Sequence, residues 1–335
     1  MKKHKKSQAR KERFSAILLS LLFLVVAVAA AVKIFVRAPQ PDDAVPKPVD
    51  AALMSVDAAQ QDETDKSVSS ANARKEYCYT ILVSGLDNDN GGSDTNILVR
   101  FDATGKSIDL VSLPRDTLLH HEWASNKLNY AYAKGGTELL CQEIENLLGI
   151  PVDFFVTVNL KGFIALVDQI GGVDFDVPVD MDYDDPYQNL HIHYSKGLQH
   201  LNGQQAMEVV RWRKNNDGIG YATADIGRIE TQQAFLSQVA RQLLKIGNVP
   251  AMAQVFFKYV KTDLTTGNLV WLGTEALEMG MDAVSFHTLP GDGSGYYRKE
   301  SVYVLDPEQT LALVNEALNP YNEPITLEDM DILVP

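Results

Sequence analysis

The sequence lacks three glycine-rich motifs that mark common types of active site. It contains no P-loop, no G-x-G-x-x-G pattern and no G-x-S-x-G pattern. The first two place backbone amides around the phosphates of a nucleotide, and the third marks the nucleophilic serine of a hydrolase. We therefore do not expect any phosphate bound by this protein to belong to a nucleotide. No internal repeat is evident either.

Cysteine is scarce, with two residues among 335. Cys78 lies in an apolar segment with strand character and Cys141 in an apolar helical segment. Their spacing matches no metal-binding pattern. A disulfide is allowed outside the cytoplasm, so two alternatives stay open, a bridge between these residues or two buried thiols.

Positive charge is scarce beyond residue 37. The whole chain carries −14, whereas residues 1–37 hold nine Lys or Arg and one acid, a net +8, which leaves −22 for the remainder. Nucleic-acid-binding domains usually carry a basic face. The acidic remainder therefore argues against nucleic acid as a partner.

The N-terminal region predicts a membrane anchor. Residues 1–13 are basic, and residues 14–36 are almost wholly apolar. An apolar run of about 20 residues spans a bilayer, and basic residues before it keep that end in the cytoplasm. A cleaved signal peptide is the alternative, but the run is long for one. We expect a single-pass protein of the cell membrane whose bulk is extracellular, joined to its anchor by a disordered tether over residues 37–75.

The rest of the chain alternates between strand and helix patterns. Interleaved strands and helices predict one α/β sandwich with a mixed central sheet, which we place at residues 76–320, followed by a C-terminal tail at 321–335. Strands are predicted at 79–84, 96–101, 107–113, 154–158, 173–177, 284–289 and 302–305. Helices are predicted at 137–148, 160–170, 204–212, 226–246 and 307–318, with 251–281 helical in pieces.

The helix after residue 224 carries charge on its apolar face. At about 100° per residue, Phe235 and Leu236 begin a stripe that runs on to Ile246. Asp225, Arg228 and Gln232 fall on that same face. Inward charge is costly unless it is paired or holds a ligand. A buried ion pair and a ligand site both fit this pattern.

Other polar groups stand where predicted strands and helices begin or end. In α/β sheets, ligands bind beyond the carboxyl ends of strands. Each group alone also fits a turn, a cap or a surface ion pair, but several arginines together suggest a phosphate-rich ligand. Carboxylates beside them suggest Mg²⁺, which binds one or two carboxylates plus substrate phosphates. The cations are Arg115, Lys127, Arg211, Arg213 and Arg228, and the acids are Asp87, Asp94 and Asp225.

Three further segments give weaker signals. His191 and His193 lie on one side of a strand as a possible metal pair, but no third ligand is evident, and a solvated strand is the alternative. Residues 180–185 lack the Gly and Glu of a calcium loop and predict a surface loop. Residues 291–295, which are rich in glycine, predict a flexible turn or a mobile lid.

The order of these motifs resembles the LytR-CpsA-Psr family over residues 77–247, together with the anchor. The matching motifs are Asp87, Ser93-Asp94-Thr95, Leu113-Pro114-Arg115-Asp116-Thr117, residues 127–132, Gly171-Gly172-Val173, Leu201-Asn202-Gly203, Arg211-Trp212-Arg213 and Asp225-x-x-Arg228-x-x-x-Gln232. The resemblance implies an α-β-α sandwich whose core admits a lipid tail. It also implies a membrane-anchored transferase that moves teichoic acid, capsule or a related polymer from a polyprenyl diphosphate carrier to peptidoglycan.

The resemblance also implies roles for individual residues. Diphosphate binding falls on Arg115, Arg211, Arg213 and Arg228, with Lys127 and Gln232 beside them, and magnesium binding falls on Asp87 and Asp94. The catalytic set would be Asp94, Arg115, Asp225 and Arg228, with Asp94 or Asp225 as the base.

Two arginines that the family often carries are replaced here by Gly92 and Thr231. We suggest that Arg100 could partly compensate for the first replacement. A surface regulator that binds polyprenyl diphosphates without catalysis and a pyrophosphatase that uses water are the alternative functions.

Overall fold

The computed structural model describes residues 36–41, 73–86, 91–187, 190–221, 225–246 and 258–335. Most of the expected membrane anchor, most of the tether and Asp87 lie outside these residues. Within the part of the chain that is described, no helix is both long and apolar enough to cross a bilayer.

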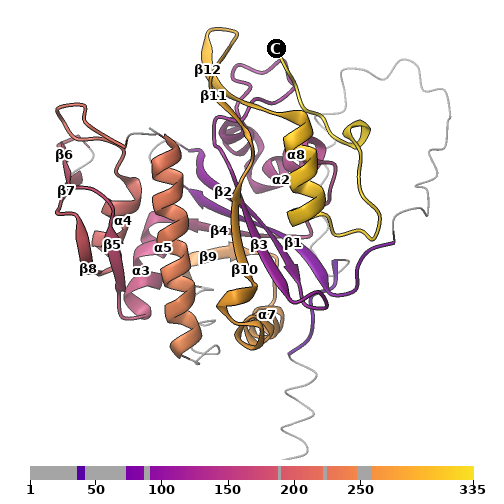
Figure 1. The fold of residues 1–335 in the computed structure, drawn as a ribbon, viewed down its shortest axis with the longest axis horizontal. Coiled ribbons are helices and arrows are strands. Elements are labelled where there is room, and N and C mark those ends of the chain that lie inside the picture. Colours follow the sequence, from indigo (N-terminus) through magenta and orange to yellow (C-terminus); the bar gives the residue numbers. More distant parts are fainter. Residues whose placement is uncertain (1–35, 42–72, 87–90, 188–189, 222–224, 247–257) are drawn as a thin grey trace, which may run out of the picture.

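A six-stranded mixed sheet forms the centre of the molecule (Figure 1). Its order is β10-β3-β2-β1-β4-β9. The pairs β1–β4 and β3–β10 are parallel, and the pairs β1–β2, β2–β3 and β4–β9 are antiparallel. The sequence prediction of a mixed central sheet is therefore confirmed. The strands are β1 (Cys78–Leu86), β2 (Ser93–Asp102), β3 (Ser107–Leu113), β4 (Phe154–Asn159), β9 (Val260–Thr262) and β10 (Val284–Thr288).

Hydrophobic cores lie on both faces of this sheet. Successive side chains of a strand point to opposite faces, so Leu82 packs on one side and Ile81 on the other. The Leu82 side is covered by α2 (Leu128–Leu148) and by the C-terminal helix α8 (Pro307–Leu313) with the turn Val314–Leu318 that follows it. The Ile81 side is covered by α7 (Thr266–Met279).

A smaller lobe packs beside the sheet and holds two antiparallel ribbons (Figure 1). Their strands share a third core with the helices of the lobe, centred on Phe175, Ile192, Trp212 and Phe235. One ribbon pairs β5 (Val173–Val177) with β8 (Gly197–Leu201), and the other pairs β6 (Met181–Asp185) with β7 (Leu190–Tyr194). The helices are α3 (Leu160–Gln169), α4 (Gly203–Arg211) and α5 (Asp225–Ile246).

Several local predictions were wrong. Residues 181–185 form strand β6 and not a loop, because they pair with β7. The segment 291–295 belongs to strand β11 (Gly291–Tyr297), which pairs with β12 (Glu300–Leu305) and is not a free turn. Residues 260–262 form strand β9 within a stretch that was predicted to be helical. No strand was predicted at Gly197–Leu201, which form β8.

The two cysteines are buried thiols that do not form a bridge. Cys78 begins β1 and Cys141 lies in α2, each with at most 2% of its surface exposed. Burial raises the pKa of the Cys78 thiol to about 11, so this group stays protonated and unreactive at neutral pH. Of the two alternatives that the sequence left open, the fold contains the buried thiols.

Residues 321–335, which we set apart as a tail, pack on the core. Ile325 is 4% exposed and joins the cluster beneath α2, and Met330 and Ile332 pack against the same cluster. The backbone amide of Asp331 donates to the carbonyl of Asn146 at the end of α2. The described part of the domain therefore extends to the end of the chain.

Candidate functional site

A large pocket opens where several strands of the central sheet end, between the sheet and the smaller lobe. Its volume is about 1140 Å³, which exceeds the range of about 300–1,000 Å³ that suits small ligands. The strand directions explain its position. The ends of β1, β3 and β4 lie on the same side of the sheet as the start of β2, because the first three strands run in one direction and β2 runs in the other. The pocket therefore lies where ligands bind in α/β sheets.

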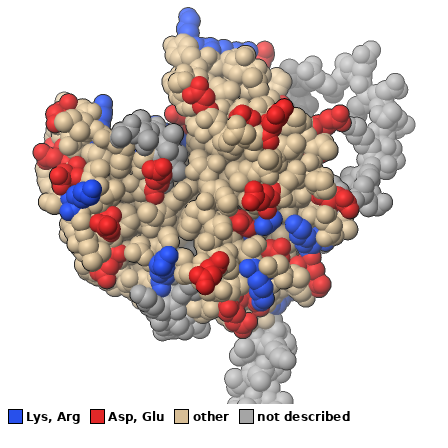
Figure 2. All heavy atoms as spheres, in the orientation of Figure 1, with Lys and Arg blue, Asp and Glu red and all other residues tan. Residues whose placement is uncertain are grey.

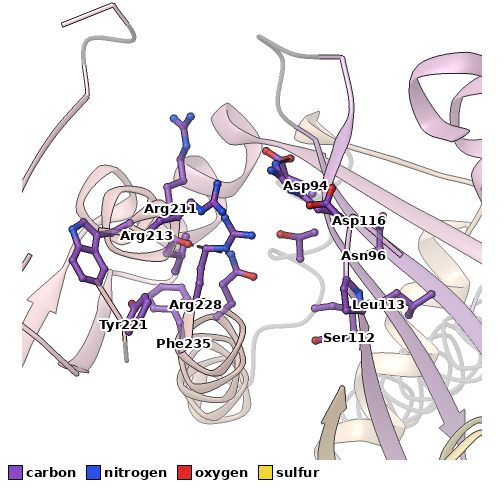
Figure 3. Close-up of a pocket in the computed structure, with 18 of the residues that line it drawn as sticks. Asp94, Asn96, Ser112, Leu113, Asp116, Arg211, Arg213, Tyr221, Arg228 and Phe235 are labelled. Atoms are coloured by element: carbon purple, nitrogen blue, oxygen red, sulfur yellow. Dashed lines mark hydrogen bonds and ion pairs between the residues drawn. The ribbon is translucent and has the colours of Figure 1, made fainter. Parts of the chain in front are cut away.

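Arginines and carboxylates face each other across this pocket. Figure 3 shows Arg211, Arg213 and Arg228 on the side of the smaller lobe, and Asp94 and Asp116 on the side of the sheet. Arg211 is the last residue of α4, and Arg213 lies two residues beyond it. The pocket thus brings together side chains from separate parts of the sequence.

Arg115 connects the carboxylates on the sheet side. Its Nη1 atom lies 2.7 Å from Oδ1 of Asp94, and its Nε atom lies 3.9 Å from Oδ1 of Asp116. Lys127 approaches the same Asp116 oxygen at 3.4 Å, but it does not itself line the pocket, contrary to the sequence prediction. The Asp94 side chain remains 40% exposed, so this ion pair leaves carboxylate oxygen accessible to a ligand.

Helix α5 contributes both polar and apolar lining. Arg228 and Gln232 line the pocket, and Phe235 and Leu236 line it one turn later. The side-chain amide of Gln232 donates to the carbonyl of Val210 in α4, which leaves its oxygen as an acceptor. The face on which the sequence placed charge beside apolar residues is therefore a wall of the pocket.

The apolar part of the pocket continues into the core of the smaller lobe. Ile192, Trp212 and Phe235 line it and belong to that core. Valine and isoleucine residues of the sheet, such as Val83 and Ile97, complete the lining. One cavity therefore combines a cationic rim with a hydrocarbon-like interior.

Not every predicted residue reaches the pocket. Arg100 lies elsewhere, 8% exposed, with its guanidinium 2.7 Å from Asp109 and bonded to the carbonyl of Glu316. It cannot replace the missing arginine at position 92 from there. Asp87 lies outside the described residues. Asp225 is the first residue of α5, and its side chain is not described.

The structure adds lining residues that the sequence reasoning did not select. Asp116 was visible as the neighbour of Arg115, and Lys214 as the neighbour of Arg213. Asp292 was visible only as part of the glycine-rich segment 291–295, and nothing in the sequence marked Tyr221 or Tyr303. Asp292 comes from β11 and Tyr303 from β12. Hydrogen bonds from the backbone and the hydroxyl of Ser294 lower the pKa of Asp292, which keeps this carboxylate charged.

The described rim is positive within a negative protein. Five cations line it (Arg115, Arg211, Arg213, Lys214 and Arg228) against three carboxylates (Asp94, Asp116 and Asp292), a net +2 in a chain of −14. Such a local excess attracts anions. The donor set on the sheet side also fits a hard cation, since Asp94 and Asp116 offer oxygen atoms that Mg²⁺ prefers.

Comparison with known proteins identifies the family. The model of the LytR_cpsA_psr family matches residues 49–319. The polyisoprenyl-teichoic acid–peptidoglycan teichoic acid transferase TagV of Bacillus subtilis is 28% identical over 79% of this chain and 69% of its own. The transferase of the same description called TagU, from Bacillus cereus, is 31% identical over 70% and 75%.

The fold agrees with this match. The crystal structure of B. subtilis TagV superposes with a TM-score of 0.61 at 25% identity, covering 77% of this chain and 98% of that one. The resemblance drawn from the order of the sequence motifs is thereby confirmed. The chain belongs to the LytR_cpsA_psr family.

Proposed function

We propose that this protein transfers a phosphate-linked glycopolymer, such as teichoic acid, capsule or a related polymer, from a polyprenyl diphosphate carrier to peptidoglycan. The observation that carries the proposal is a single pocket with an arginine-rich rim and an apolar interior. Such a pocket matches a ligand that is anionic at one end and hydrocarbon at the other. The named activities of the relatives agree with this ligand.

The arginines provide the diphosphate site. Guanidinium groups bind phosphate oxygens in pairs of hydrogen bonds. Arg211, Arg213 and Arg228 present three such groups opposite Asp94, and Arg115, which is paired with Asp94, adds a fourth. The first turn of α5, which contains Arg228, adds the partial positive charge of a helix N-terminus. The apolar lining from Phe235 to Ile192 accommodates the start of the polyprenyl chain.

The reaction is a phosphoryl transfer. A hydroxyl oxygen of peptidoglycan, the C6 hydroxyl of muramic acid, attacks the phosphorus that carries the first sugar of the polymer. A new P–O bond forms, and the bond to the bridging oxygen breaks, so polyprenyl phosphate leaves with that electron pair. Asp94 or Asp225 takes the proton of the hydroxyl. Catalysis of this type depends on positioning and on neutralising charge, which the four arginines supply.

Magnesium is part of the proposal. Asp94 would hold it, with Asp87 as implied by the family resemblance, and Asp116 lies at the same rim. When bound there, Mg²⁺ would offset negative charge on the diphosphate oxygens. Removal of divalent cations with a chelator should then lower transfer.

The N-terminal segment gives the site its location. An anchor at residues 14–36 would keep the domain at the outer face of the cell membrane, with the N-terminus in the cytoplasm. A polyprenyl carrier embedded in that membrane could then enter the pocket without leaving the bilayer entirely.

The deciding experiment substitutes Arg228→Ala and Arg115→Ala in the full-length protein and measures transfer from a synthetic polyprenyl diphosphate-linked glycan to peptidoglycan. Loss of one group that stabilises transition-state charge costs about 10²–10³-fold in rate, and we expect at least this loss for each variant. Arg241→Ala is the matched control, because Arg241 is an exposed arginine of the same helix. The melting temperatures of all three variants should remain close to that of the parent.

Undiminished transfer by either pocket variant would overturn the assignment. Two other outcomes identify the alternative functions. A parent protein that binds the carrier but never cleaves it would be a surface regulator. Release of polyprenyl phosphate with water as the acceptor, and no polymer on peptidoglycan, would indicate a pyrophosphatase.

A further inference from the structure

The β6–β7 ribbon carries histidines and aspartates on its outer face. In the antiparallel register, Asp184 stands opposite His191 and Asp182 opposite His193. Residues two apart on a strand share a face, so all four side chains point the same way. They are exposed, whereas Ile192 between the histidines is buried. Figure 2 shows several acidic side chains on the lobe that carries this ribbon.

Three of these side chains converge on one point. Oδ1 of Asp184 lies 2.5 Å from Nδ1 of His191 and 3.4 Å from Nε2 of His193. One ligand atom from each residue lies within 4.8 Å of the other two. Zinc bonds of about 2.0–2.1 Å in tetrahedral geometry place neighbouring ligand atoms roughly 3.3 Å apart. The separation of Asp184 and His193 already has this value.

The fourth residue, Asp182, orients one of the histidines. Its Oδ1 atom lies 2.7 Å from Nδ1 of His193. A proton on Nδ1 that is held by Asp182 leaves the Nε2 lone pair directed toward Asp184. Histidines that bind metals nearly always donate their other ring N–H to a carboxylate or a carbonyl in this way. The ribbon thus provides a ligand set together with the group that fixes its tautomer.

We propose that His191, His193 and Asp184 form a binding site for a zinc-like transition-metal ion, with Asp182 orienting His193. The ion replaces the hydrogen bond between His191 and Asp184, and both exposed side chains have room to separate to bonding distance. Water completes the coordination as a fourth ligand. Two imidazole nitrogens favour zinc, copper or nickel over magnesium or calcium, so this site differs in kind from the carboxylates of the pocket.

The site would stabilise a wall of the pocket. The inner face of the same ribbon presents Tyr183, Leu190 and Ile192 to the pocket. A ribbon of two strands has little stability of its own. An ion bound by Asp184 on β6 and by two histidines on β7 links these strands, and so holds that wall in place. Metal binding by the ribbon does not depend on the transfer reaction proposed for the pocket.

The test uses the full-length protein in detergent after treatment with a chelator. Zn²⁺ alone is titrated by calorimetry, and Co²⁺ is titrated while its visible absorption is recorded. We expect one ion per chain at this site, and an affinity that falls at least tenfold in the His191→Ala and His193→Ala variants. The Co²⁺ band typical of tetrahedral nitrogen and oxygen ligands should disappear in the double variant.

His200→Ala is the matched control. His200 pairs with Asp174 across the β5–β8 ribbon at 2.7 Å, in the same kind of exposed cross-strand pair, but it belongs to no metal-type cluster of described residues. The affinity of the His200→Ala variant for Zn²⁺ should equal that of the parent. Equal binding by the parent and the double variant, or no binding by a parent whose circular dichroism shows it to be folded, would overturn the proposal.

Discussion

At the scale of single residues, Thr231 shows how α5 serves the core as well as the pocket. Its side chain is 4% exposed, and its hydroxyl lies 2.9 Å from the hydroxyl of Tyr221 and 2.9 Å from the carbonyl of Gly227. Tyr221 in turn packs edge-on against Trp212, with ring centroids 4.8 Å apart. Thr231, where the family resemblance led us to expect an arginine, thus supports the aromatic wall of the pocket in this chain.

This contact predicts a measurable coupling between Thr231 and Tyr221. Thr231→Val keeps the shape of the side chain and removes its hydroxyl, and Tyr221→Phe removes the partner. A net hydrogen bond contributes about 0.5–1.5 kcal/mol, so each variant should lose about that much free energy of unfolding in urea. The double variant should lose less than the sum of the two. Strict additivity would show that the two hydroxyls do not stabilise each other.

At the scale of elements, α2 contains a kink that its sequence explains. Gly135 and Gly136 have non-helical backbone angles inside the helix, with φ 69° and ψ −155° at Gly136. Only glycine adopts that region without strain. The kink separates the first turns, which follow Lys127 near the pocket, from the long part that packs on the sheet. The sequence prediction placed only residues 137–148 in this helix, so it missed the turns that precede the glycine pair.

Gly136→Ala should therefore destabilise the protein. A non-glycine residue in this conformation costs about 1–3 kcal/mol. An added Cβ would meet only the flexible end of Glu138, at 3.3 Å, so the cost arises from the backbone and not from crowding. Chemical denaturation measures the loss. Ala133→Ser, at an exposed site one turn earlier, should change stability by less than about 0.5 kcal/mol, and a similar small change at Gly136 would contradict the explanation.

The elements also show what sequence could and could not predict. Strands β1 to β4 were predictable because their apolar runs are long and buried on both faces. Strand β6 was missed because four of its five residues are polar or aromatic and two of its carboxylates point to solvent. Strand β9 has three residues, too few for a periodic pattern. Pairing with another strand decides such segments, with the neighbouring β7 in the case of β6 and with the distant β4 in the case of β9.

The same distinction applies to the pocket. The motif order located Asp94, Arg115, Arg211, Arg213, Arg228 and Gln232, all of which the structure brings to one cavity. Arg100 was placed wrongly because it lies near the end of β2, whereas the pocket lies at the start of this strand. Its guanidinium is held by Asp109 on the next strand. Tyr303 and Asp292 belong to the C-terminal hairpin, and only the folded chain brings that hairpin to the rim.

At the scale of the whole molecule, the two ends of the domain hold each other. Arg74 forms an isolated antiparallel β-bridge with Tyr321, and the backbone amide of Lys75 donates to the carbonyl of Pro320. Arg74 also forms two hydrogen bonds of 2.6 Å to Asp153. The residues that follow, up to Ile332, cover α2 and the sheet. Stability of the domain should therefore depend on its last residues.

Truncation tests this dependence. Deletion of residues 324–335 removes the buried Ile325 together with Met330 and Ile332. Loss of one buried aliphatic side chain costs about 2–5 kcal/mol, and we expect at least that decrease in the free energy of unfolding. Deletion of residues 334–335 alone, both exposed, is the control and should be neutral. Equal stability of the two truncated proteins would show that residues 324–333 contribute nothing to the fold.

The position of β10 has a consequence for how the chain is made. Strand β3 is complete when residue 113 has been synthesised, but its outer edge is covered only by residues 284–288. An uncovered strand edge readily pairs with other chains. During synthesis, the protein therefore passes through a long interval in which it can aggregate. A helper that shields this edge until the C-terminal part arrives would raise the yield of folded protein.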